Sequence, residues 1–157
     1  MKKIGIISLY GNRNYGNKLQ SYAVQEFFRD FELDTVVIKN CDFYEDSYEL
    51  DIFKRYLVEC KNLLKHFLLL NRKTKIVPGT REEKFKKFSD KYIIETEGYV
   101  DRYNYKKKIP ICDYYVVGSD QVWNYHFASL GNPLYYLEFA PQNKRLSIAA
   151  SFGFSTY

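Results

Sequence analysis

The chain has 157 residues, a formal net charge of +5 and three cysteines. This length suits one domain with a substantial core, and the odd number of cysteines, without a C-x-x-C pair, indicates neither a disulfide framework nor a zinc site and favours a reducing cytoplasm. The apolar stretch near the N-terminus breaks at Gly11 without a cleavage site, so it predicts a strand and not a signal peptide, and no run reaches the ~20 apolar residues of a membrane span.

The first expected unit is a strand, a polar turn and a helix. Residues 3 to 9 are apolar and β-branched, and the string GNRNYGNKLQ follows at residues 11 to 20. Glycine and asparagine tolerate positive φ, which predicts a tight turn. Asn17 is the expected N-cap, with Gln20 close to completing a capping box. A helix N-terminus suits an anion, but the Lys and Ser/Thr of a P-loop are absent. The alternative, that this stretch is only a polar turn before a capped helix and binds no ligand, stays open.

The helix is expected over residues 17 to 31, and the strand TVVI over residues 33 to 39 completes a parallel, right-handed βαβ unit. Its wide apolar face is predicted to consist of Leu19, Ala23, Val24, Phe27, Phe28 and Phe31.

The middle of the chain is strongly basic. Residues 52 to 77 hold seven Lys/Arg against Glu59, a local balance of +6, and their apolar residues recur at helical spacing. This predicts a long amphipathic helix, which either packs on the core with a solvated lysine face or touches an anionic membrane or polyanionic partner. Nucleic acid is not expected, because no nucleic-acid motif accompanies the charge. After Pro78-Gly79, Thr80 is the expected cap of a second helix that ends near Tyr92.

The last third returns to the sheet. Residues 113 to 117 and 145 to 150 are expected strands, ending at GSD and SFG. Alternating strands and helices predict a doubly wound, mostly parallel α/β sheet. Ligands collect beyond the carboxyl ends of such strands. We therefore expect GNRNYGN, GSDQVWN and SFG to lie at one edge.

The string GSDQVWN, residues 118 to 124, carries the only tryptophan of the chain. Asp and Asn side chains bond sugar hydroxyls, and an indole offers a flat face to a sugar ring. Asp120 could also accept a proton from a hydroxyl. The alternative is that Ser119 or Asp120 caps a short helix while Trp123 fills the core. No metal site is expected, because no metal-ligand spacing occurs, and neither His66 nor His126 accompanies a site signal.

Three stretches together resemble, in order and spacing, the N-terminal half of the polysaccharide pyruvyl transferases: KIGIISLYGNRNYGNKLQSYAVQ, DYYVVGSDQVWN and YYLEFAPQNKRLSIAASFG. The resemblance covers most of residues 2 to 42 and 110 to 155. It implies one Rossmann-like domain over residues 1 to 157, similar to one half of a GT-B fold, with a helical insertion at about 43 to 109.

The resemblance also implies an activity. Family members transfer pyruvate from phosphoenolpyruvate, the donor substrate, to two sugar hydroxyls as a cyclic ketal in surface or capsular polysaccharide biosynthesis, with no cofactor. Such chemistry requires a general acid, a base for the hydroxyls and cationic partners for phosphate. The implied catalytic residue is Asp120. The implied substrate-binding residues are Asn14, Tyr15, Gly16, Asn17, Gln20, Gly118, Ser119, Gln121, Trp123, Asn124, Ser151 and Gly153.

Family members continue into a second half, whereas this sequence stops at Tyr157. We therefore expect the chain to be inactive alone, with a sugar or glycan acceptor and either the missing C-terminal half or a second copy in a homodimer as partners. The alternatives are a non-catalytic remnant or glycan-binding subunit, and, with less support, a GT-B glycosyltransferase. The expected location is the cytoplasm, where the basic helix would face the inner side of the membrane.

Overall fold

The structure is a computed structural model that describes residues 1–10, 14–40, 60, 64, 77–100, 104–124 and 133–154. The basic helix expected over residues 52–77 falls almost wholly outside these residues. Across the ranges just given, no helix is long and apolar enough to cross a membrane.

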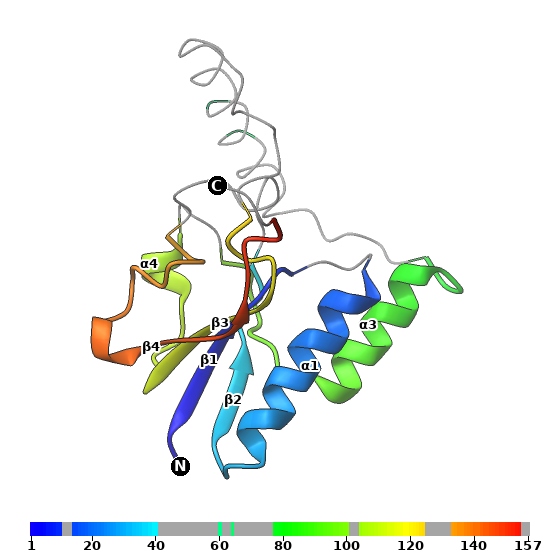
Figure 1. The fold of residues 1–157 in the computed structure, drawn as a ribbon. Helices are drawn as coiled ribbons and strands as arrows, with labels where there is room; N and C mark the ends of the chain where they lie inside the picture. Colours follow the sequence, from blue (N-terminus) through cyan, green and yellow to red (C-terminus); the bar gives the residue numbers. More distant parts are fainter. Residues whose placement is uncertain are drawn as a thin grey trace.

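One parallel sheet forms the centre of the molecule. It consists of β1 (Lys3–Ile7), β2 (Asp34–Val37), β3 (Tyr114–Asp120) and β4 (Arg145–Ala150), in the order β2-β1-β3-β4 (Figure 1). All three pairings in the described chain are parallel. The expected α/β, Rossmann-like fold is confirmed, and β4 has the predicted bounds.

The central strand β1 is buried on both faces. Ile4 and Ile6 pack in one apolar cluster together with Val24, and Ile7 belongs to a second cluster that contains Tyr135. A strand buried on both faces reads as a continuous apolar run, as parallel strands covered by helices do. Each such side chain contributes about 1.5–3 kcal/mol by its burial.

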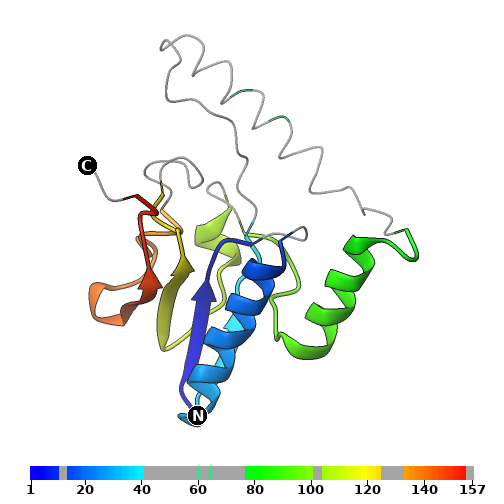
Figure 2. The same ribbon diagram turned by 45° about the vertical axis from the view of Figure 1, so that its right-hand side comes forward.

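Helices cover both faces of the sheet. The helices α1 (Tyr15–Arg29) and α3 (Arg81–Tyr92) lie side by side on one face, and the short α4 (Tyr105–Lys108) lies on the other (Figures 1 and 2). The predicted cap of α3 is confirmed, because the Thr80 side chain accepts a hydrogen bond from the Glu83 amide. A 3-10 turn, Gln142–Lys144, leads into β4.

The start of α1 differs from the prediction. Its N-cap is Asn14, whose Oδ1 accepts the Gly16 amide at 2.8 Å, and not Asn17. Asn14 has the extended backbone of a capping residue, with φ −119° and ψ 117°, so the helix begins directly after it. Asn17 and Gln20 therefore lie inside the helix and form no capping box.

The buried face of α1 also differs. The fully buried residues are Lys18, Ser21, Val24 and Gln25, whereas Leu19, Phe27 and Phe31 are 53%, 46% and 63% exposed. Val24 and Phe28 of the predicted face do pack on the core, but the buried side of the helix is shifted from the predicted one. Polar residues can occupy this face because they find partners beneath it.

These partners include both backbone groups and side chains. The Gln25 side chain accepts the Ile94 amide at 2.9 Å and donates to the Tyr92 carbonyl. The Ser21 hydroxyl lies 2.8 Å from that of Ser8. The buried polar side chains of α1 thus have hydrogen-bond partners, which hydrophobic periodicity does not register.

The close approach of β1 to β3 yields a first prediction. Gly5→Ala should lower the free energy of unfolding by about 1–3 kcal/mol, the usual cost of overpacking, because a Cβ there would lie 2.8 Å from Tyr115 Cδ1. Gly98→Ala is the matched control, since its Cβ would meet no described atom within 4 Å. Urea unfolding followed by circular dichroism measures both variants. Equal midpoints would contradict the packing of β1 against β3.

Candidate functional site

The candidate site lies at the edge where the parallel strands end. In Figure 1 the carboxyl ends of β1, β3 and β4 point the same way. Asp120 is the last residue of β3, Ser151 follows β4, and the described part of the first motif is the N-cap and the first turns of α1. The described parts of the three sequence motifs therefore share one edge, as predicted from the strand pattern.

The second and third motifs are joined directly. The Ser151 amide donates to the Asp120 carbonyl at 3.0 Å, and the Trp123 amide donates to the Ser151 carbonyl at 3.2 Å. These two bonds continue the contact between β3 and β4 beyond the strand ends. The loop after β3 is consequently fixed by the chain that follows β4.

Two glycines permit this close approach. Gly118 has a φ of +117°, and a Cβ there would overlap the Ile148 carbonyl. Gly153 has a φ of +76°, and a Cβ there would overlap the Gln121 side chain and lie 2.8 Å from Asn124 Nδ2. Neither position accepts a side chain without movement of its neighbours.

Several predicted ligand groups instead support the loop. Asn124 is 4% exposed, and its amide nitrogen donates to Gln121 Oε1 at 2.9 Å. The Trp123 indole donates to the Tyr135 carbonyl at 3.0 Å and packs against the core. Its ring also lies 5.5 Å from that of Phe152, between centroids. Trp123 thus fills the core in part, as the alternative interpretation held, and stays half-buried.

The polar groups best placed for a ligand are at the end of β3. The Asp120 Oδ1 accepts the neighbouring Gln121 amide at 2.7 Å. Among the described residues, Asp120 Oδ2 and the Ser119 hydroxyl make no hydrogen bond, and both residues are only half-buried. Ser151, which lies next to them, is exposed. A carboxylate beside hydroxyls can hold a sugar hydroxyl and accept its proton.

The first motif lies at the same edge but packs against α3. Asn14, Tyr15 and Gly16 are exposed, and Asn17 and Gln20 are half-buried. The Tyr15 ring lies 4.2 Å from that of Phe85 on α3, between centroids. Gly11, Asn12 and Arg13, the rest of the turn, fall outside the described residues.

One group of residues at this edge was missed in the sequence. The Lys18 ammonium lies 3.0 Å from Glu95 Oε1, and the Tyr10 hydroxyl donates to Glu95 Oε2 at 2.9 Å. Burial lowers the pKa of Lys18, while its bond to Glu95 opposes that shift; burial raises the pKa of the Tyr10 phenol. The polar stripe of Lys18, Ser21 and Gln25 at helical spacing was the available signal.

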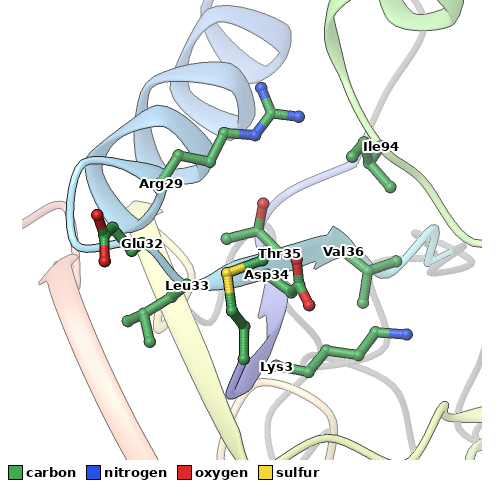
Figure 3. Close-up of a pocket in the computed structure, with 9 residues that line it drawn as sticks. Lys3, Arg29, Glu32, Leu33, Asp34, Thr35, Val36 and Ile94 are labelled. Atoms are coloured by element: carbon green, nitrogen blue, oxygen red, sulfur yellow. The ribbon is translucent and has the colours of Figure 1, made fainter.

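A hollow of about 450 Å³ lies at the opposite edge of the sheet (Figure 3). Its lining comes from the starts of β1 and β2 and the end of α1, including Lys3, Arg29 and Asp34. None of the motif residues line it. We place the candidate site at the carboxyl edge, because parallel α/β sheets bind ligands there and the motifs meet there.

The fold is that of a Rossmann-like α/β domain with polar and aromatic residues at the carboxyl edge of its sheet. A family model, described as polysaccharide pyruvyl transferase, matches residues 14–157. The chain belongs to that family. Comparison with curated proteins gives no significant match.

The contact between the second and third motifs yields another prediction. Gly153→Ala should destabilise the chain more than Gly79→Ala by about 0.5–1.5 kcal/mol, the net value of a hydrogen bond, because it displaces Gln121 from Asn124. Gly79 is a matched control, since its φ of +79° is close to the +76° of Gly153 while its Cβ would meet no described atom within 4 Å.

Thermal unfolding compares the two variants, and the Asn124 side-chain amide signal in NMR reports the local change. An unchanged amide signal in Gly153→Ala would contradict the contact.

Proposed function

We propose that this chain provides the acceptor side of a pyruvyl transferase that uses phosphoenolpyruvate and forms a cyclic ketal on a sugar of a surface polysaccharide. Membership of the polysaccharide pyruvyl transferase family is the observation that carries this proposal. The groups at the end of β3 support it, because Ser119 and Asp120 offer a hydroxyl and a carboxylate oxygen to an acceptor hydroxyl.

The proposed reaction balances without a cofactor. A proton adds to the methylene carbon of phosphoenolpyruvate, and one sugar hydroxyl adds to the neighbouring carbon. Phosphate then leaves with the bonding electrons, and the second hydroxyl attacks the resulting cationic carbon. Of the two hydroxyl protons released, one balances the proton now in the ketal methyl group and the other leaves with phosphate. In this scheme Asp120 accepts a hydroxyl proton.

The side chains at this edge favour the acceptor over the donor. A phosphate is bound by Arg, Lys or a group of backbone amides. The described residues of the three motifs include no Lys or Arg, and Arg13 of the first motif lies outside them. Lys18, which directly follows the first motif, is 2% exposed and paired with Glu95. The remaining groups are amides, hydroxyls, aromatic rings and one carboxylate. They fit sugar hydroxyls, and we assign the phosphate of the donor to other residues.

A glycan-binding protein without turnover is the second candidate, and the scarcity of cations among the described motif residues favours it. Phosphate release separates the two. The full-length protein is incubated with phosphoenolpyruvate and a panel of hexosides, each paired with an analogue in which one hydroxyl is methylated. The proposal expects phosphate release that needs both substrates and fails with the methylated analogues. In D₂O the ketal methyl group should carry one deuterium. Hexoside binding without phosphate release would favour the second candidate.

The role of Asp120 yields a third prediction. Asp120→Asn should lower turnover on the order of 10²–10⁴-fold, as loss of a general base does. The free energy of unfolding should change by about 1 kcal/mol or less, the value of a local cap. Asp113→Asn is the matched control, because Asp113 lies just before β3, at the opposite edge, where its carboxylate accepts the Lys3 amide. Steady-state kinetics and urea unfolding are measured on both. If Asp120→Asn retains its turnover, Asp120 is not the general base and serves only as a local cap.

A further inference from the structure

Glu95 holds both flanks of the first motif. Tyr10 precedes residues 11–17 and Lys18 follows them. Each oxygen of the Glu95 carboxylate contacts one of the two: Oε2 lies 2.9 Å from the Tyr10 hydroxyl, and Oε1 lies 3.0 Å from the Lys18 ammonium. The ammonium also lies 3.9 Å from the centre of the Tyr10 ring. One carboxylate thus ties Tyr10 to Lys18, the two residues that flank the motif.

The position of Glu95 is itself fixed by the sheet. Glu95 forms a parallel bridge with Val37 at the end of β2, and the Val37 amide donates to the Ile94 carbonyl at 2.8 Å. The Gln25 side chain of α1 accepts the Ile94 amide. The carboxylate is therefore presented from a backbone that is bonded on two sides.

Stability alone does not explain a charged pair at this place. The side chains of Lys18 and Glu95 are 3% and 14% exposed, and two charges taken out of water lose hydration that their attraction only partly returns. A buried ion pair can often be replaced by apolar residues of similar volume without loss of stability. What apolar residues cannot replace is the direction of the two bonds to Glu95.

The geometry points to Glu95 as a positioning residue, which holds residues 14–17, the described part of the first motif, at the carboxyl edge in the arrangement that binds the acceptor. The identity of the ligand rests on the proposed function, whereas the hold on the motif does not. Glu95 itself acts through Tyr10 and Lys18.

The test separates position from stability. The double variant Lys18→Met/Glu95→Leu removes both charges and keeps an apolar pair, so its unfolding midpoint should stay near that of the wild type. The Gly16 backbone amide, which donates to Asn14 Oδ1, should exchange with deuterium about 3- to 10-fold faster, as expected when the hydrogen bond that protects it is lost. The KM for the hexoside should rise on the order of 10- to 100-fold, as misplacement of a binding group does. The KM for phosphoenolpyruvate should not change.

Glu26→Gln is the matched control, because it removes a carboxylate from a partly exposed pair with Arg29 on α1. It should alter neither exchange of the Gly16 amide nor either KM. If the double variant folds, a wild-type exchange rate or a wild-type hexoside KM overturns the positioning role.

Two further outcomes also decide the question. If the wild type shows no turnover, the proposed function fails, and amide exchange in the double variant alone decides whether Glu95 holds the motif. If the double variant does not fold, Tyr10→Phe replaces it, since it removes only one hydroxyl and keeps the ring under Lys18. Faster exchange of the Gly16 amide supports the role, and unchanged exchange overturns it.

Discussion

The parallel pairing of β1 between β2 and β3 is the constraint on which the rest of the structure depends. Gly5 lies opposite Val36 on one side and Tyr115 on the other. Because neighbouring strands run the same way, the chain leaves each of them at one edge, and each return must pass over a face of the sheet. That single fact brings three motifs from distant parts of the sequence to one place.

At that place the second and third motifs are held by backbone contact. Gly118 lies against the Ile148 carbonyl, and Gly153 lies against the Gln121 and Asn124 side chains. Both glycines adopt positive φ, so the backbone conformation and the close contact each favour glycine at these two positions. The polar side chains of GSDQVWN accordingly divide in two. Asn124 stabilises the loop, whereas Ser119 and Asp120 keep groups that a ligand can use.

Much of the fold could be predicted from the sequence, because strands buried on both faces give short, continuous apolar runs and Thr80 is a strong capping residue. The shared edge followed from the parallel order. The orientation of α1 could not be predicted, because hydrophobic periodicity assumes an apolar buried face, and Lys18, Ser21 and Gln25 are buried with polar partners that come from residues far along the chain. The same limit concealed Glu95, which lies 77 residues from Lys18.

The two parts of the candidate site are therefore held by different forces. The second and third motifs depend on steric fit and neutral hydrogen bonds, which salt and pH affect little. The first motif is flanked by a buried ion pair, whose strength comes from a low local dielectric and which salt screens weakly. A neutral contact tolerates small shifts, whereas a carboxylate shared by an ammonium and a phenol fixes the distance between them. The part of the edge that contains the first motif is thus the part whose geometry is tied to charge, through the contact between Lys18 and Glu95.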